Sequence, residues 1–358
     1  MAALTRRQLL TRLGLVGTSS LIALAAGEGL ARWLVPARPR IRLRQFTDIV
    51  EGVHRFEFDA LFRPDTERFW KLAPGLRFPD DDRPLFGLIS NAQGFRQEGE
   101  VPRRKPAGEL RVICLGDSCT FGYLQPHDET YVFKLERKLA AALPGRAIRC
   151  INAGVPGYSL FQGWRYLETE LLRYQPDLVT LNFGWNDLVA WDGRGDLEHY
   201  RQMRAETPPA PLDVSRLCQL AWRLAAGSGL DTVLSERPRL LPYEFRALLE
   251  SCREATDRAG AELLVLLWGA RPNVEAGFYR SYRTPLQEEQ ARFGRSIRFG
   301  PDGGPALVDG VAVFEAMART HSIPEIFADG VHPTAAGADQ VARAMLDRIG
   351  PWARERLA

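Results

Sequence analysis

The segment VICLGDSCTFG, residues 112–122, joins an apolar run to a turn of glycines and small polar residues. A short, continuous apolar run that ends in glycine is typical of a buried β-strand, so we expect a strand to end at Gly116. Two adjacent nucleophiles, Ser118 and Cys119, follow it. Side chains one position apart diverge strongly after a strand, so only one of the two is expected to face a site.

Four more apolar runs follow, and helical patterns separate most of them. The runs cover residues 147–154, 177–184, 261–269 and 306–310, and the helical patterns cover residues 129–143, 160–175, 243–259 and 334–349. Continuous apolar strands that alternate with helices indicate parallel strands covered on both faces. The sequence therefore predicts a layered α/β domain over residues 109–358, with a parallel sheet of about five strands. Residues 190–242 break this alternation and are predicted to be an insertion.

The basic residues concentrate at the N-terminus. Residues 1–45 contain eight Lys and Arg and a single acidic residue, Glu28, although the net charge of the whole chain is only +3. The remainder is therefore slightly acidic, and we predict no nucleic-acid partner. Residues 36–108, rich in Pro, Arg and aromatic residues, are predicted to be a small accessory region of short strands and loops.

Residues 1–35 have the layout of an export signal. Three arginines precede an uncharged apolar stretch, Leu13–Gly27, which is shorter than the roughly 20 residues that a spanning helix needs. The segment TRRQLL, residues 5–10, resembles the twin-arginine export signal. We therefore predict an exported protein, periplasmic or extracytoplasmic, which the export machinery delivers. Cleavage of the leader and its retention as a membrane anchor both stay open, and the alternative is a short amphipathic leader of a cytoplasmic protein.

The chain has five cysteines, an odd number without a CxxC pair. This pattern predicts neither a disulfide framework nor a zinc cluster. A disulfide between Cys218 and Cys252 stays open.

Polar or glycine-containing turns stand at four points where the predicted strands end or a helix begins. They are Gly116–Gly122, Asn152–Gly154, Gly184–Asp187 and Asp329–Pro333. In sheets of this kind the functional residues lie at the carboxyl ends of the strands, so we expect the four turns to converge at one edge of the sheet.

These turns contain the parts needed for acyl transfer to a hydroxyl group. Ser118 is the candidate nucleophile, His332 the base, and Asp329 the group that orients the imidazole. The N–H groups of Ser118 and Gly154 and the side-chain amide of Asn186 are the candidate oxyanion donors. Taken alone, Asp329 and His332 would be read as a capping aspartate and a surface histidine, but the other three residues favour catalysis.

The four turns, in this order, resemble the four blocks of the SGNH (GDSL-type) hydrolase family. Gly-Asp-Ser-x-Thr at 116–120 resembles the first block, Gly154 the second, Gly-x-Asn-Asp at 184–187 the third and Asp-x-x-His at 329–332 the last. The resemblance implies a flavodoxin-like three-layer α/β/α sandwich, a Ser118–His332–Asp329 triad, and oxyanion donors at Ser118, Gly154 and Asn186. We predict no cofactor and no metal. The segment SNAQGFR, residues 90–96, resembles an element that precedes this domain in some bacterial members.

The prediction is an exported serine esterase that hydrolyses acyl esters, acetyl esters among them, on a small molecule or a glycan. The alternative is an O-acyltransferase that uses the same triad on a cell-envelope or exported glycan. A third class, a non-catalytic carbohydrate-binding module, is disfavoured because every catalytic position is filled. Trp185 and His127 are candidate substrate contacts, and Cys119 is predicted to be a buried, unreactive thiol.

Overall fold

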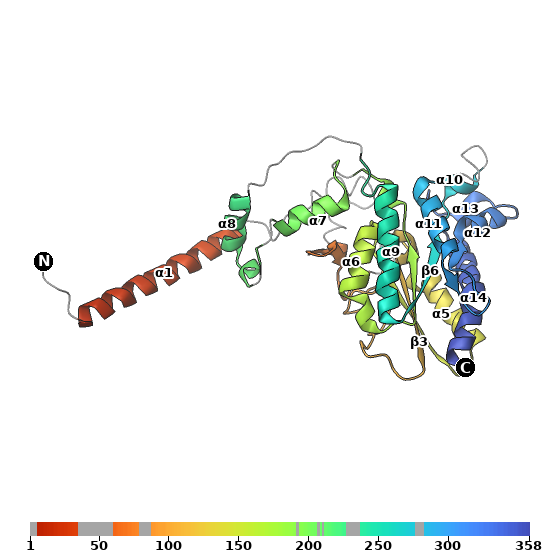
Figure 1. Cartoon of the computed structure of the whole chain (residues 1–358), viewed down its shortest axis with the longest axis horizontal. Helices are drawn as coiled ribbons and strands as arrows, with labels where there is room; N and C mark the ends of the chain where they lie inside the picture. The colour runs from red at the N-terminus through yellow and green to blue at the C-terminus, as the bar shows by residue number, and fades with distance from the viewer. Residues whose placement is uncertain are drawn as a thin grey trace. The chain divides into compact units, whose positions relative to one another are not determined.

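The computed structural model describes residues 6–34, 60–78, 87–190, 193–205, 208–209, 211–226, 237–275 and 283–358. The chain divides into two compact units (Figure 1). Unit 1 combines residues 1–42 with residues 198–232, and unit 2 comprises residues 43–197 and 233–358. The stretches 60–78 and 87–108, from the predicted accessory region, thus belong to the same unit as the sheet.

Unit 2 is built on a five-stranded parallel sheet, as predicted. Its strands are β3 (Glu109–Gly116), β4 (Ala147–Gly154), β5 (Leu178–Asn182), β6 (Glu262–Leu267) and β9 (Leu307–Asp309), in the spatial order β4-β3-β5-β6-β9. Strand β3 is the first of these five strands along the chain and lies second in the sheet. This is the flavodoxin-like strand order. The strands are buried almost throughout because helices cover both faces.

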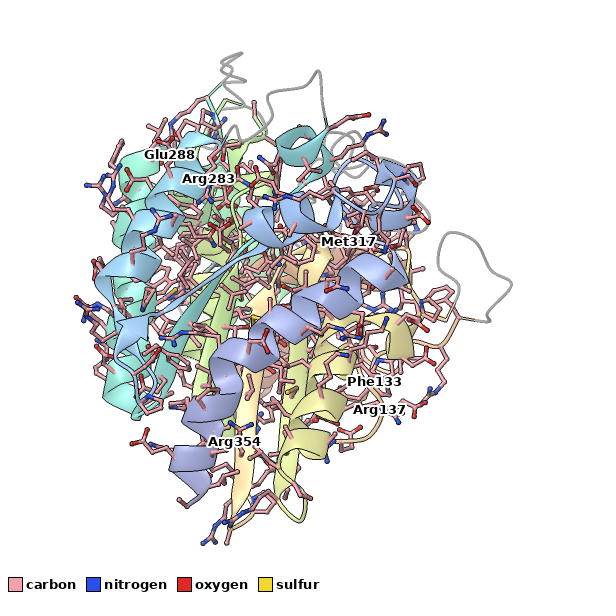
Figure 2. The ribbon with its side chains drawn as sticks, turned by 90° about the vertical axis from the view of Figure 1, so that its right-hand side faces the viewer. Phe133, Arg137, Arg283, Glu288, Met317 and Arg354 are labelled. Carbon is pink, nitrogen blue, oxygen red and sulfur yellow. The ribbon has the colours of Figure 1, made fainter. Side chains whose placement is uncertain are left out.

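Helices α5 (Tyr131–Ala142) and α14 (Ala335–Leu357) lie side by side on one face of the sheet (Figure 2). Thr130 caps the start of α5 by accepting the N–H of Phe133. The apolar residues of α5 recur at helical spacing, and they join residues of α14 and alternate strand residues in one buried cluster. Phe133 and Arg137, labelled in Figure 2, lie one helical turn apart on α5 outside this cluster, with the guanidinium 5.9 Å from the ring.

Helices α6 (Leu160–Thr169) and α9 (Pro242–Ala259) cover the other face. Gly163 lets α6 approach the sheet closely, since a Cβ at this position would lie 2.2 Å from the ring of Phe183. Ser159 and Gln162 form a capping box that starts α6 after the loop that follows β4. The three-layer α/β/α sandwich is therefore confirmed.

Shorter elements complete the described part of the chain. They are β1 (Phe62–Asp65), β2 (Phe69–Leu72), α4 (Ser118–Phe121), η1 (His127–Glu129), η2 (Leu171–Tyr174), η3 (Asn186–Leu188), α7 (Asp196–Ala205), α10 (Arg271–Val274), α11 (Pro285–Ser296), β7 (Arg298–Phe299), β8 (Gly304–Pro305), α12 (Gly310–Met317) and α13 (Ile323–Ile326).

The segment SNAQGFR protects the edge of the sheet. Strand β4 lies at the edge, and the N–H of Arg96 donates to the carbonyl of Asn152 while the side chain of Gln97 accepts the N–H of Asn152. The buried guanidinium of Arg96 donates to three carbonyl groups and stacks on Phe121 at 4.8 Å. The segment therefore binds both the edge strand and the helix that follows β3.

The predicted insertion leaves and re-enters unit 2 at one point. Ala190 forms a bridge with Pro238, and the N–H of Arg239 donates to the carbonyl of Val189. Arg239 and Asp196, both buried, form a two-point ion pair of 2.8 and 2.9 Å across this neck. The two ends of the insertion are thus held together independently of its middle.

Unit 1 contains α1 (Arg6–Leu34), most of α7, η4 (Leu212–Val214) and α8 (Arg216–Ala226). The carboxylate of Glu28 accepts the hydroxyl of Ser215 at 2.7 Å and the N–H groups of Arg216 and Leu217 at 3.0 and 3.1 Å. Two segments that lie 187 residues apart in the chain are therefore joined at the start of α8. Among the described residues, no helix combines the length and the apolarity needed to cross a membrane.

Candidate active site

The ends of three neighbouring strands lie at the same level in the sheet. Gly116, the last residue of β3, is paired with Gly154 of β4 and with Asn182 of β5. The turns that follow these strands therefore start side by side, as the sequence predicts. Their convergence brings Ser118 and Asn186 to one edge.

The nucleophile turn, residues 116–122, presents Ser118 at the first position of α4. Asp117 caps this helix by accepting the N–H of Cys119 at 2.9 Å, and Gly122 ends it with a φ of +79°. Every residue of the turn is buried except Ser118, which is half-buried. The fold thus leaves a single hydroxyl within reach of a substrate.

Two glycines allow the turn to pack closely on the sheet. A Cβ on Gly154 would lie 2.2 Å from the backbone nitrogen of Phe121, and a Cβ on Gly116 would lie 2.1 Å from the hydroxyl of Thr120. The carbonyl of Thr120 also accepts the side-chain amide of Asn152. Glycine at these strand ends therefore serves the close approach of α4 to the sheet.

Ser118, His332 and Asp329 form a continuous hydrogen-bonded row. The imidazole Nε2 of His332 lies 2.8 Å from the hydroxyl oxygen of Ser118, and its Nδ1 lies 2.6 Å from the carboxylate of Asp329. The ring of Tyr123 lies against the imidazole, with the ring centres 5.1 Å apart. This is the arrangement in which an imidazole can accept the proton of a hydroxyl nucleophile.

The histidine turn, Asp329–Pro333, is held from within by its own carboxylate and from outside by neighbouring elements, since the indole of Trp268 and the N–H of Arg271 donate to its carbonyls at 3.1 and 3.0 Å. The second oxygen of Asp329 accepts the N–H groups of Val331 and His332 at 2.8 and 2.7 Å. Partial burial alone would raise the pKa of Asp329, but the hydrogen bonds and charge of His332 outweigh it and lower the pKa below 3.8. The side chain of Gln125 donates to the carbonyl of Pro333 at 2.7 Å and ties this turn to the segment after the nucleophile turn.

Asn186 begins η3 directly after β5, at the edge where Ser118 lies. Its side-chain amide donates to the carbonyl of Tyr158 at 3.1 Å and, over a longer 3.3 Å, to the carboxylate of Asp117. Burial raises the pKa of Asp117 to about 6, although the N–H of Cys119 and the charge of His332 lower it. Both amide hydrogens of Asn186 thus have acceptors, and the longer contact is the weaker of the two.

The N–H of Gly154, predicted to be an oxyanion donor, has a different partner in the structure. It donates to the side-chain oxygen of Asn152 at 3.0 Å, and the backbone of Phe121 lies against its Cα. The geometry therefore does not support Gly154 as a donor to a substrate. Because it has no side chain, Gly154 allows α4 to pack closely against the end of β4.

Gly157, three residues further on, was not predicted as a site residue. Its φ is +77°, and within the described part of the chain its N–H donates no hydrogen bond, although its carbonyl accepts the guanidinium of Arg239 at 2.7 Å. A buried N–H group without a partner is uncommon and marks a donor available to a ligand. The sequence signal for it was present, since Gly157 is the glycine of the loop that joins β4 to α6.

Cys119 faces the helix layer, as predicted. It is buried in the cluster that includes α5 and α14, and its sulfur lies 3.9 Å from the carbonyl of Val331. Burial, and then the charges of Asp117 and Asp329, raise the pKa of the thiol well above 9. All five cysteines are free thiols, so Cys218 and Cys252 form no disulfide.

The two predicted substrate contacts lie in different surroundings. Trp185 is half-buried beside Asn186 and packs on the apolar cluster below the histidine turn. His127 packs on Phe133, with ring centres 5.0 Å apart, and lines a cavity of about 190 Å³ with Glu136 and Arg149, among others. No triad residue lines that cavity. The structure thus places Trp185 next to the site and turns His127 towards a different cavity.

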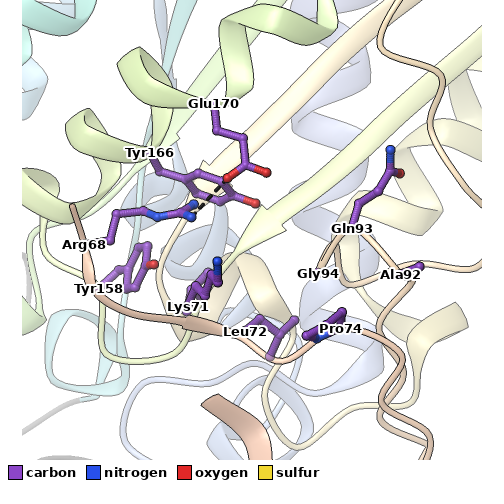
Figure 3. Close-up of a pocket in the computed structure, with 11 residues that line it drawn as sticks. Arg68, Lys71, Leu72, Pro74, Ala92, Gln93, Gly94, Tyr158, Tyr166 and Glu170 are labelled. Carbon is purple, nitrogen blue, oxygen red and sulfur yellow. Dashed lines mark ion pairs between the residues drawn. The ribbon is translucent and has the colours of Figure 1, made fainter. Parts of the chain in front are cut away.

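A second cavity, of about 120 Å³, lies between β2 and α6 (Figure 3). Arg68 on its wall pairs with Glu170 at 3.0 Å and stacks on the ring of Tyr166 at 4.1 Å, so its charge is already balanced. No triad residue lines this cavity either. Among the described residues, no group of three or more His, Cys, Asp or Glu side chains is placed to hold a metal ion.

Comparison with known proteins identifies the family of this chain. The family model described as GDSL-like lipase/acylhydrolase matches residues 114–340, which is more than half of the chain. No curated protein matches the sequence.

Solved structures of similar fold are distant in sequence. Axe2, an acetylxylan esterase from Geobacillus stearothermophilus, is 20% identical over 67% of this chain and 94% of its own, with a TM-score of 0.45. A GDSL-like lipase from Parabacteroides merdae is 15% identical over 70% of this chain and 99% of its own, with a TM-score of 0.44. The four sequence blocks, the site geometry and the family match agree. The chain belongs to the GDSL-like lipase/acylhydrolase family and is an ester hydrolase of the SGNH type.

Proposed function

We propose that this protein hydrolyses acyl esters through a covalent intermediate on Ser118. His332 takes the proton of the Ser118 hydroxyl as the oxygen attacks the ester carbonyl, and it then donates that proton to the departing alcohol. A water molecule, deprotonated by the same imidazole, attacks the acyl-enzyme and releases the acid. The observation that carries the proposal is the row of contacts from Ser118 through His332 to Asp329, at 2.8 and 2.6 Å.

Asp329 supports both halves of this cycle. Its carboxylate holds the Nδ1 proton, which leaves Nε2 free to accept a proton from serine or from water. Because the pKa of Asp329 is lowered, the carboxylate stays charged and stabilises the imidazolium formed in each step.

The negative charge on the carbonyl oxygen needs donors, and three N–H groups are proposed for it. The N–H of Ser118 is at the first turn of α4, where a helix leaves its amides unpaired. The amide of Asn186 exchanges its long contact with Asp117 for the oxyanion. Gly157 takes the place first predicted for Gly154, because its N–H has no partner within the described residues.

Export remains part of the proposal and depends on the sequence of residues 1–35. The twin-arginine-like segment and the uncharged stretch after it support delivery across a membrane. The substrate is proposed to be a short acyl ester, acetyl included, on a small molecule or a glycan. Trp185 is the proposed contact for the group next to the ester.

The test is a series of p-nitrophenyl esters from acetyl to decanoyl, given to the wild type and to two variants. Ser118→Ala and His332→Ala should each reduce kcat by at least about 10⁴-fold. A fluorophosphonate should label the wild type and should not label Ser118→Ala. Activity that survives in Ser118→Ala would overturn the assignment.

The same enzyme should then be given an acetylated glycan with and without an acceptor glycan. Release of the free acid is the expected result. Net transfer of the acyl group to the acceptor glycan would instead identify the enzyme as an O-acyltransferase, with the same residues in the same roles.

A further inference from the structure

The exposed apolar side chains of this protein are concentrated in unit 1. Of the large hydrophobic side chains that are exposed in the described part of the chain, all but Leu197 and Tyr243 belong to that unit. They are Leu15, Val16, Leu21, Ile22, Leu24, Leu30, Trp33 and Leu34 of α1, together with Leu212, Val214, Trp222 and Leu224 in and just before α8. Apolar surface of this extent marks a contact with another molecule or with a membrane.

Unit 1 is also strongly basic. It contains eleven arginines, no lysine and five acidic residues, whereas the rest of the chain has a net negative charge. Exposed apolar side chains and an excess of arginine in the same unit match the surface of an anionic lipid bilayer, which attracts cations and receives apolar groups.

The N-terminal helix is joined to the insertion by a specific polar contact. Glu28, the only acidic residue of α1, accepts the first two N–H groups of α8, those of Arg216 and Leu217, and the hydroxyl of Ser215. The N–H groups in the first turn of a helix have no acceptor within the helix. Glu28 accepts two of them in α8 and thus caps this helix from a distant part of the chain. The hydrogen bonds from Arg216 and Leu217 lower the pKa of Glu28 to about 2, and the cap is therefore charged at neutral pH. Arg32 adds an ion pair of 2.8 Å to the carboxylate oxygen that also accepts the N–H of Arg216.

A cap of this kind gives the N-terminal helix a role in the folded protein. Removal of α1 at a leader cleavage site would leave the start of α8 without its acceptor. We propose that α1 is retained, and that α1 and residues 212–226 together form a docking surface for an anionic phospholipid bilayer. The uncharged stretch Leu13–Gly27 is about 22 Å long as a helix, which is less than the roughly 30 Å of a bilayer core. A stretch of this length does not cross that core, so the proposed contact is with one face of the bilayer, with the apolar side chains inserted and the arginines of unit 1 attracted to the anionic headgroups.

Flotation of the full-length protein with vesicles tests this surface. The probe is vesicles of phosphatidylcholine and phosphatidylglycerol in equal amounts, with pure phosphatidylcholine vesicles as the comparison. The wild type should float with the anionic vesicles and float less with the neutral ones. Leu224→Glu should weaken vesicle binding by about tenfold, because it replaces one inserted leucine by a charge.

Tyr243→Glu is the matched control, since Tyr243 is 66% exposed and Leu224 76%, but Tyr243 belongs to α9 of unit 2. It should bind vesicles as the wild type does, and all three proteins should hydrolyse a short soluble ester at the same rate. Equal binding by Leu224→Glu and Tyr243→Glu would overturn the proposal. So would failure of the wild type to float, or a dimer in solution that Leu224→Glu dissociates, which would assign the surface to a second copy of the chain.

Retention of α1 has its own test. The intact mass of the protein recovered from its native membrane fraction should include residues 6–34, and a mass that lacks them would contradict the proposal. In Glu28→Ala the amides of Arg216 and Leu217 should exchange with deuterium at least about tenfold faster than in the wild type. Unchanged exchange would show that Glu28 does not cap α8.

Discussion

The nucleophile turn and the histidine turn meet at Ser118 and His332, but they differ in burial and in what positions the catalytic side chain. The nucleophile turn is buried except for Ser118, and it is fixed by contacts from neighbouring strands, such as those of Asn152 and Asn182 with Thr120. The histidine turn is half-exposed, and both the N–H and the imidazole Nδ1 of His332 are bonded to Asp329 of the same turn. Bonds from other elements, such as that of the Trp268 indole, go to carbonyls of the turn other than that of His332.

The two turns thus position their catalytic side chains in two different ways. Ser118 is positioned by the core, so its geometry depends on the stability of the sheet. His332 is positioned by a residue of its own turn, so one substitution at Asp329 changes both the electrostatics and the backbone.

The largest effect is expected at Asp329. Both Asp329→Asn and Asp329→Ala should reduce kcat by roughly 10⁴-fold, because neither keeps the carboxylate that holds the Nδ1 proton. Asn retains an oxygen for the N–H groups of Val331 and His332, whereas Ala leaves them without that acceptor. Urea denaturation should therefore show Ala to be about 1–3 kcal/mol less stable than Asn. Equal stabilities would mean that the turn does not depend on Asp329.

Asp117→Asn should reduce kcat by about 10²-fold. The variant keeps one oxygen, which the N–H of Cys119 requires, and its NH2 group then faces the amide of Asn186, so that one oxyanion donor is disturbed. The same variant has a pH signature. The pKa of Asp117 is about 6 in the folded protein, above 3.8, so the native state binds more protons between these values. The wild type should lose stability relative to Asp117→Asn as the pH rises from 4 to 6, by up to about 3 kcal/mol. Parallel stability curves over this range would contradict the raised pKa.

Gln125→Ala removes the bond from the Gln125 side chain to the carbonyl of Pro333. We expect kcat to fall by ten- to hundredfold, since a displacement of about 1 Å at His332 is enough for such a loss, with KM nearly unchanged. Gln340→Ala, on the exterior side of α14, is the control and should match the wild type. A rise in KM with constant kcat would indicate that Gln125 contacts substrate instead.

The smallest effect is expected at Cys119. Cys119→Ala should keep activity within about threefold of the wild type and cost about 1 kcal/mol of stability, as for the loss of a small buried group. Thiol reagents should leave the activity of the native wild type unchanged. Loss of activity comparable to Ser118→Ala would reassign the nucleophile.

The sheet could be predicted from the sequence because each strand is a continuous apolar run of its own. The convergence of Ser118, Asn186 and His332 followed from parallel strands ending at one edge. The structure brings Ser118 and His332 into contact and places Asn186 at the same edge.

Other features depend on contacts that a linear pattern does not contain. Gly154 ends β4 and Gly157 follows three residues later, so the sequence alone does not indicate which of the two N–H groups is available as an oxyanion donor. The structure distinguishes them, because the N–H of Gly154 donates to the side chain of Asn152 and Gly157 has a positive φ. His127 precedes a helix near the nucleophile turn, but its ring packs on Phe133, away from the triad. The contact of Glu28 with α8 joins residues 187 positions apart, so neither local propensity nor spacing indicates it.

The closed neck of the insertion has a consequence for how this enzyme can vary. Arg239 and Asp196 fasten the two ends, and the N–H of Leu240 donates to the carbonyl of Asp187, the neighbour of Asn186. A change in the length or composition of the chain between Asp196 and Arg239 is therefore expected to leave Asn186 in place. A related enzyme could acquire a different means of attachment at this position, or lose attachment altogether, and keep the same chemistry.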